Sequence, residues 1–520
     1  MTPFARRRLL VTTLPLLLLA GCGTTVPLTT QSELGAGTST GAGLGTTGTD
    51  QPGSVAGAAT TGPGASSTAG STTGGTTGLG SSGGSSGTLP QPAGGLGGST
   101  LGNGPGVTAT TITIGVTYYQ SAGDANAALG ANGVNQGDPG PAVKALRDDI
   151  NAHGGIAGRK LVLLAYAVDP QSSQSYATLG QAVCSYFTED HKVLAVIDGT
   201  PAADARACLE KRRVAHLGGT LISSPASQHD FSVVGSRLLR VYNVLPTALH
   251  DHGWFGPWDR TNGRPGTLRA KTGIVTADSP DDNDAVDHAL VPGLRRLGYA
   301  PAAADIIRIT PPNGFSDDGA VVAAIQSAVL KLNADGVDHV ILNDGNGSLS
   351  LFFHRYALSQ HYFPRYGGTS GSGWQVLLSS HNMEPQTLAG AMGIGWQPPL
   401  DLPYQNGDGQ YSNAARHRCF TLLRAAGSPP TDAASAGGAA EVCDLMLFIP
   451  AALRGYRGPV DINVLTQRVD ALGSSYQLAS GLASRVASDQ HDVVGGYSFM
   501  LFDGGCGCVK YQGPVIPTPH

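Results

Sequence analysis

Residues 23–107 are not expected to form part of a folded domain, because they consist almost entirely of Gly, Ser, Thr, Ala and Pro. With almost no charge and few large apolar side chains, the segment cannot bury enough surface to offset its ordering entropy. We expect a flexible coil with a root-mean-square reach of roughly 50 Å, either a spacer or compositional filler. A folded body is therefore expected only from about residue 108 to residue 520.

The first 22 residues indicate export. A basic run at residues 6–8 precedes an apolar run at residues 9–20, which is too short to span a bilayer. Leu19-Ala20-Gly21-Cys22 resembles the lipobox of bacterial lipoproteins, which implies cleavage before Cys22 and lipid attachment to it. The alternative is an ordinary secretory signal with a chance cysteine. We expect a signal peptide at 1–21 and a lipid-attached disordered tether at 22–107, with the body at the extracytoplasmic face of the cell membrane.

The other cysteines predict disulfides. They are Cys184, Cys208, Cys419, Cys443, Cys506 and Cys508. An even number in an exported chain favours disulfides, although six cysteines permit fifteen pairings. The spacing groups them into three close pairs. Since a ring closed over one residue is strained, a metal-binding or reactive pair is the alternative for Cys506 and Cys508.

Charge and motifs exclude several function classes. The chain has 32 Lys and Arg against 37 Asp and Glu, with no basic block, so no nucleic-acid partner is expected. Neither HExxH nor paired CxxC spacing occurs, and the glycine-rich run at 367–373 lacks the GxSxG spacing. We therefore expect no metal, no cofactor and no enzymatic activity.

The body alternates apolar strands with helices, which predicts parallel βαβ units. Predicted strands lie at 112–117, 160–168, 193–197 and 214–217, with helices from Pro139, at 177–187 and near 203–211. The pattern then restarts, with strands at 272–276, 305–309 and 339–342 and helices at 281–297, 316–333 and from about Ser348. Two α/β lobes in tandem are the simplest interpretation.

Several strings in the body resemble type I periplasmic binding proteins. Residues 112–116 and the string DDINAHGGIAGRKL at 148–161 resemble the opening of leucine/isoleucine/valine-type solute receptors of ABC importers. Further similar strings lie at 169–170, 193–199, 314–317 and 334–340. The resemblance covers most of residues 110–520 and weakens after about 400. Such receptors also have a cysteine pair bridging their second and third helices, which supports a Cys184–Cys208 bond.

The resemblance implies two doubly wound α/β lobes joined by a three-strand hinge. The N-terminal lobe would comprise 108–242 and about 381–484, and the C-terminal lobe 243–380 and about 485–520. Such receptors close around a small solute and present it to an ABC permease. This implies a membrane-tethered receptor for a small polar solute such as an amino acid or amide. The alternative is a non-transport lipoprotein that uses the same clamshell as a sensor or regulator of cell-envelope enzymes.

Ligands of open parallel sheets bind beyond the carboxyl ends of the strands, and this rule selects the candidate ligand contacts. They are Tyr119, Gln120, Thr200, Gly219, Thr220, Tyr242, Asp278, Ser279, Asp344 and Asn346. Tyr242 is expected at the first hinge crossing. The run at 278–282 also fits an N-cap, an N1 proline and first-turn acids, and the run at 343–348 also fits a turn.

The second lobe departs from the amino-acid receptors at two positions. Those receptors have an aromatic residue before the first helix of this lobe and an acidic residue after its third strand. Here the first position has no aromatic residue. Ser348 lies near the second position, and Asp344 could take the place of the missing acidic residue. A polar or cationic solute is therefore as compatible with the sequence as a branched-chain amino acid.

Overall fold

The computed structural model describes residues 103–135, 138–198, 203–218, 228–345, 347–405 and 411–519. The predicted signal peptide, the lipidation of Cys22 and nearly all of the tether lie outside the described residues. The same is true of the predicted ligand contacts Thr200, Gly219, Thr220 and Asn346.

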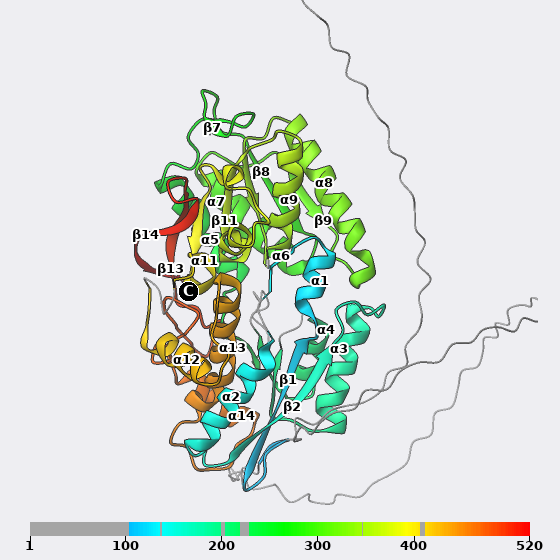
Figure 1. Ribbon diagram of the computed structural model, residues 1–520, viewed down its shortest axis with the longest axis vertical. Coiled ribbons are helices and arrows are strands. Elements are labelled where there is room, and N and C mark those ends of the chain that lie inside the picture. The colour runs from blue at the N-terminus through cyan, green and yellow to red at the C-terminus, as the bar shows by residue number, and fades with distance from the viewer. Residues whose placement is uncertain are drawn as a thin grey trace, which may run out of the picture. The chain divides into compact units, whose positions relative to one another are not determined.

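The first lobe is built on a five-stranded parallel sheet with the order β2-β1-β3-β4-β5. Its strands are β1 (Thr111–Tyr119), β2 (Lys160–Val168), β3 (Ala195–Asp198), β4 (Ala215–Gly218) and β5 (Asp230–Ser232). Helices α3 (Tyr176–Ser185) and α4 (Ala203–Lys211) pack on one face. Helices α2 (Pro139–Ala152), α12 (Ala414–Ala425), α13 (Ala433–Ala452) and α14 (Ile462–Asp470) pack on the other (Figure 1).

Helix α2 shows how local sequence builds this lobe. Asp138 caps it by accepting from Gly140 N at 2.8 Å, and Pro139 occupies the first turn, where no backbone N–H is needed. Ala142, Val143, Leu146 and Ile150 recur at helical spacing and are buried against the sheet. The predicted helix from Pro139 is thus present.

The second lobe contains a seven-stranded sheet with the order β14-β13-β12-β11-β10-β8-β9. Its parallel strands are β8 (Thr272–Ala277), β9 (Ile306–Ile309), β10 (His339–Leu342), β11 (Arg365–Thr369) and β12 (Met392–Gly395). The antiparallel hairpin of β13 (Gly496–Asp503) and β14 (Cys508–Pro517) extends it. At the outer edge, β14 is exposed over its last six residues and carries Pro514 and Pro517.

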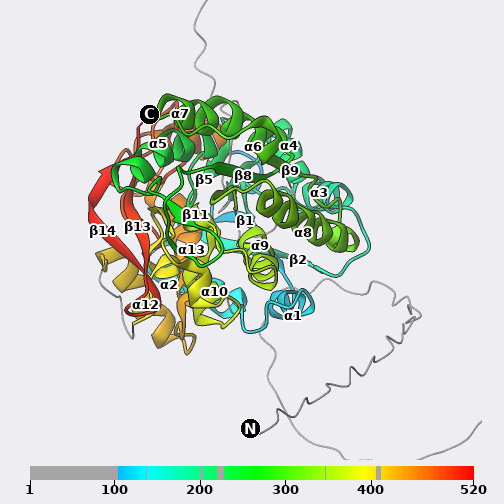
Figure 2. The same cartoon turned by 90° about the horizontal axis from the view of Figure 1, so that it is seen from above.

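Helices cover both faces of this second sheet (Figure 2). On one face are α5 (Leu238–Asp251), α6 (Pro280–Ala285) and α7 (Val291–Arg296). On the other are α8 (Asp318–Ala334), α9 (Ser348–Ser359) and α10 (Trp374–Ser379). Short elements complete the lobes: α1 (Ala122–Ala128), α11 (Pro398–Asp401) and the hairpin of β6 (Trp258–Asp259) with β7 (Arg264–Pro265).

Three segments connect the lobes, at 233–237, 396–397 and 492–495. Val493 N donates to Ser232 O at 2.9 Å, and Leu482 N donates to Trp396 O at 3.2 Å. The fully buried carboxylate of Asp492 accepts from Ser236 Oγ, from Arg237 N and from the Arg240 guanidinium. This carboxylate therefore ties the third connection to the first.

The lobe boundaries differ from the expected ones. Strand β12 still belongs to the second sheet, so the chain returns to the first lobe after Gly395 rather than near residue 381. The third connection comes at 492–495, somewhat after residue 485. The expected position of Tyr242 at the first crossing is wrong, because that crossing ends before α5 begins at Leu238 and Tyr242 lies inside the helix.

All three predicted cysteine pairs form disulfides in the structure. Cys184 of α3 joins Cys208 of α4, and Cys419 of α12 joins Cys443 of α13, with Cα–Cα distances of 6.1 and 6.0 Å. Each bond links neighbouring helices and closes a separation of 24 residues, which is worth about 3 kcal/mol by chain-entropy scaling. Cys506 joins Cys508 at the β13–β14 turn.

Among the described residues, one helix is long and apolar enough to cross a membrane. This is α13, with a mean hydropathy of 1.2, and it is mostly buried in the core of the first lobe. Its apolar character is therefore explained by packing against α2, α11 and α12.

Candidate functional site

The carboxyl edge of the first sheet brings together the ends of β1 and β3. Thr117 pairs in register with Asp198, and the Thr117 hydroxyl donates to the Asp198 carboxylate. Tyr119 follows on β1 and is half-buried, whereas Gln120 is exposed. Burial raises the pKa of the Tyr119 hydroxyl well above its ordinary value, and Tyr176, Asp198 and Asp318 add to the rise. Asp318 belongs to the second lobe, so Tyr119 lies near both lobes.

Below this edge, His216 of β4 lies between two carboxylates. Its Nε2 is 3.2 Å from Asp198 and its Nδ1 is 2.7 Å from Asp230. Burial alone lowers the pKa of His216, but hydrogen bonds and attraction from both carboxylates outweigh it and raise the pKa to about 9. The two carboxylates therefore favour the protonated form of His216. Sequence reasoning missed it, although a histidine in an otherwise apolar strand was a visible signal.

On the second lobe, Asp278 and Ser279 immediately precede α6. Ser279 Oγ accepts from Asp282 N at 3.1 Å, and Pro280 occupies the first turn. The exposed Asp278 accepts from Asn283 Nδ2 at 2.9 Å. Ser279 thus caps the helix, as the alternative interpretation of this run expected, and Asp278 precedes the cap.

Asp344 has a similar structural role at α9. Its carboxylate is buried and accepts from Gly347 N at 3.0 Å and from Ser350 N at 2.7 Å. A carboxylate bound to first-turn N–H groups stabilises the helix N-terminus. Asp344 is thus held by backbone N–H groups at the start of α9.

Tyr242 and Asn343 form a buried polar network at the carboxyl end of β10. The Tyr242 hydroxyl donates to Asn343 Oδ1 at 2.7 Å. Asn343 Nδ2 in turn donates at 2.8 Å to both Thr276 Oγ1 and Asp282 Oδ1. Burial raises the pKa of Asp282. Tyr242 is only 1% exposed, so it positions Asn343 from beneath the strand ends.

Residues 121–135, which we call the strap, link the first lobe to the second. The strap leaves the end of β1, contains α1 and packs Ala131 into the core of the second lobe (Figure 1). Arg355 of α9 donates to Gly130 O at 2.6 Å, and Asn382 Nδ2 donates to Asn132 O at 2.6 Å.

A second contact between the lobes lies at the start of α3. Tyr176 N donates to Asn313 O at 2.7 Å. The nearby acids Asp317 and Asp318 raise the pKa of Tyr176, with burial as the larger cause. The strand ends of the two lobes therefore face each other across a region with tyrosine and aspartate side chains.

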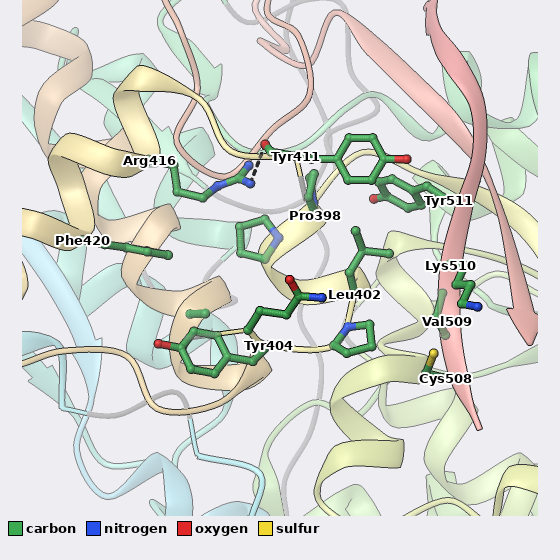
Figure 3. Close-up of a pocket in the computed structure, with 14 residues that line it drawn as sticks. Pro398, Leu402, Tyr404, Tyr411, Arg416, Phe420, Cys508, Val509, Lys510 and Tyr511 are labelled. Atoms are coloured by element: carbon green, nitrogen blue, oxygen red, sulfur yellow. Dashed lines mark hydrogen bonds between the residues drawn. The ribbon is translucent and has the colours of Figure 1, made fainter. Parts of the chain in front are cut away.

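A cavity of about 400 Å³ lies elsewhere, between α11, α12, α13 and β14 (Figure 3). It is lined by Pro398, Pro399, Leu402, Pro403, Tyr404, Gln405, Tyr411, Arg416, Phe420, Ala436, Cys508, Val509, Lys510 and Tyr511. The guanidinium of Arg416 donates to Ala479 O at 2.6 Å and to Tyr411 O at 2.8 Å. None of the predicted ligand contacts lines this cavity.

The Tyr511 hydroxyl connects the cavity to a buried carboxylate. It donates to Asp401, which also accepts from Ser370 Oγ at 2.6 Å and from Gln397 N at 3.2 Å. Burial raises the pKa of Asp401 to about 6 despite these hydrogen bonds. Among the described residues, no group of three or more His, Cys, Asp or Glu is placed to hold a metal ion.

Comparison with known proteins gives no match to any protein-family model or curated sequence. Solved structures do match. A possible leucine/isoleucine/valine-binding protein from Rhodopirellula baltica is 15% identical with a TM-score of 0.54, over 78% of this chain and 97% of that one. A solute-binding protein of an ABC transporter from Rhodopseudomonas palustris, in complex with 3,4-dihydroxy benzoic acid, is 14% identical with a TM-score of 0.55, over 78% and 98%.

The substrate-binding protein LivJ from Streptococcus pneumoniae, in complex with isoleucine, is 16% identical with a TM-score of 0.51. That match covers 78% of this chain and all of the other. The chain therefore has the fold of the type I periplasmic binding proteins, as its sequence predicted. The matched structures come from receptors described as binding different solutes, so the likeness establishes the architecture and leaves the solute open.

Proposed function

We propose that this protein is an extracytoplasmic solute-binding protein that holds a small polar solute between its lobes and presents it to an ABC permease. The observation that carries the proposal is the pair of α/β sheets whose strand ends face each other, bridged by the strap and by the Tyr176–Asn313 hydrogen bond. Solutes bind beyond the carboxyl ends of such strands. The export signal, lipidation of Cys22 and the tether would hold the body at the membrane.

The charges between the lobes favour a solute with an ammonium or other cationic group. Tyr119 and Tyr176 of the first lobe lie near Asp318 of the second, close enough that the aspartate raises the pKa of both hydroxyls. Burial, together with repulsion from Asp317, raises the pKa of Asp318 and so disfavours its charged form. A bound cation would offset this cost and pack against the tyrosine rings.

A thermal-shift panel of amino acids, amides, polyamines and sugars tests the proposal. A true ligand at a hundred times its dissociation constant stabilises the protein by roughly 2.7 kcal/mol. Asp318→Asn removes the carboxylate and Tyr119→Leu removes the aromatic ring, so each should reduce that shift for an amine ligand. Asp335→Asn, at the other end of α8 and paired with Lys331, is the matched control and should leave the shift intact.

Two outcomes would contradict the proposal. Chemical conversion of the bound compound would replace the receptor assignment with an enzymatic one. A shift that survives Asp318→Asn and Tyr119→Leu but is lost on substituting residues of the α11–β14 cavity would move the solute site there.

A further inference from the structure

The disulfide between Cys506 and Cys508 differs from the other two in its accessibility. Cys506 lies in the exposed turn between β13 and β14, and Cys508 is the half-buried first residue of β14. By contrast, neither of the other bonds has an exposed cysteine: Cys184, Cys419 and Cys443 are at most 1% exposed, and Cys208 is half-buried. A thiol arriving from solvent therefore reaches the Cys506–Cys508 bond first.

The hairpin does not depend on this bond. The β13–β14 ladder runs from the Asp503–Cys508 pair outward through backbone hydrogen bonds. Asp503 also holds the turn, accepting from Gly505 N at 2.7 Å and from Lys510 Nζ at 2.5 Å. A bond between residues only two apart removes little conformational entropy from the unfolded chain, whereas the other two close separations of 24 residues. Reduction of Cys506–Cys508 should therefore leave the fold intact.

The surroundings also accommodate the reduced form. Cys506 Sγ lies 3.5 Å from Asp503 O, which would accept a hydrogen bond from a thiol. Lys510 follows Cys508 by two residues and so lies on the same face of β14, where its ammonium favours a thiolate. Asp503 partly opposes this effect because it pairs with Lys510.

The geometry points to a reversible thiol–disulfide exchange site at Cys506–Cys508, whose electron donor is a dithiol outside the cytoplasm. A donor thiolate attacks the exposed Cys506 Sγ, the S–S bond breaks, and Cys508 leaves as a thiolate. The second donor thiolate then attacks the donor sulfur of the mixed disulfide and releases Cys506. Two electrons and two protons pass to this protein, and the donor becomes a disulfide.

The site adjoins the cavity between α11, α12, α13 and β14. Cys508, Lys510 and Tyr511 line that cavity from β14 (Figure 3). Exchange would therefore change the chemistry of the cavity wall from disulfide to thiol. The inference rests on the proposed extracytoplasmic location but not on the identity of the solute.

A dithiothreitol titration of the oxidised full-length protein tests the site. After alkylation and peptide mapping, Cys506 and Cys508 should be labelled at dithiothreitol concentrations that leave Cys184–Cys208 and Cys419–Cys443 intact. Far-ultraviolet circular dichroism should stay unchanged, and oxidised glutathione should restore the bond. Reduction of Cys506–Cys508 together with, or after, the two helix-linking disulfides would overturn the inference.

A second experiment identifies the class of donor. A thioredoxin whose resolving cysteine is replaced by serine should form a mixed disulfide with Cys506, and none with a Cys506→Ser/Cys508→Ser variant. Such an adduct assigns a protein dithiol as donor. Ready reduction by dithiothreitol with no adduct assigns a small dithiol instead. If neither donor reduces the Cys506–Cys508 bond selectively, the proposal of an exchange site is wrong. A solute-induced thermal shift measured on the same sample tests the proposed receptor function separately.

Discussion

The guanidinium of Arg355 in α9 donates a hydrogen bond to the backbone carbonyl of Gly130, although the two residues belong to different lobes. Gly130 lies in the strap that leaves β1, the strand between β2 and β3 in the first sheet. Arg355 also donates to Asn382 Oδ1 at 2.9 Å, and Asn382 holds the carbonyl of Asn132. One arginine thus organises both anchors of the strap on the second lobe.

Arg355→Ala should therefore loosen the strap. Loss of a charged donor to a half-buried carbonyl is expected to cost about 1–2 kcal/mol of unfolding free energy. Hydrogen exchange in the peptide 121–135 should accelerate, including at Ala131 N, which donates to Asn126 O at 2.8 Å. Arg295→Ala, at an exposed position of α7 in the same lobe, is the control. Equal exchange in both variants would show that Arg355 does not hold the strap.

His216 predicts a loss of stability in alkaline solution. Its pKa is raised to about 9 in the folded protein from an ordinary value of 6.5. Protonated His216 therefore contributes stability that is fully present below pH 6.5 and is lost as pH rises through 9, by about 3 kcal/mol in all. Urea unfolding of His216→Gln between pH 6 and 10 should show a flatter pH profile. His250→Gln, at a half-exposed histidine, should keep the wild-type slope.

Asp401 predicts a change in the acid range. Burial raises its pKa to about 6 from 3.8, so the folded protein binds this proton more tightly than the unfolded chain. The resulting stability is present below pH 3.8 and is lost as pH rises through 6, by about 3 kcal/mol. Asp401→Asn should remove this part of the pH dependence measured by urea unfolding. An unchanged profile, equal to that of the exposed-site control Asp489→Asn, would contradict the assignment.

Tyr242 can be tested as a ligand contact or as a structural residue. Tyr242→Phe removes the donor to Asn343 Oδ1 and leaves a buried acceptor unpaired, which should cost about 1–2 kcal/mol of unfolding free energy. If Tyr242 acts only through Asn343, any solute-induced shift should be reduced less than by Asp318→Asn. Tyr299→Phe, on a half-buried ring stacked against Phe255, is the control.

Local pattern was enough to predict the strand–helix alternation. The predicted strand at 339–342 and helix at 203–211 coincide with β10 and α4, because apolar runs and helical spacing identify such elements without tertiary information. The position of Tyr242 was expected from the family resemblance and not from local pattern. The crossing ends a few residues earlier, and Tyr242 lies inside helix α5.

Contacts between residues far apart in the chain could not be predicted from local sequence pattern. The strap has no apolar periodicity of its own, and its partners Arg355 and Asn382 are 225 and 250 residues away in the chain. The His216–Asp230 pair depends on β4 and β5 becoming neighbours. The candidate contacts Asp278, Ser279 and Asp344 do follow strand ends, but the same residue types also serve helix N-termini. Ser279 caps α6, and Asp344 accepts from backbone N–H groups at the start of α9.

The outer edge of β14 bears on how this protein behaves at high concentration. An exposed edge strand offers a row of N–H and C=O groups to which a second chain can add. Pro514 and Pro517 have no backbone N–H to donate, and they flank Val515 and Ile516, which are each 40% exposed. A second molecule therefore cannot form an uninterrupted ladder of hydrogen bonds along this part of the edge, although apolar side chains face solvent there.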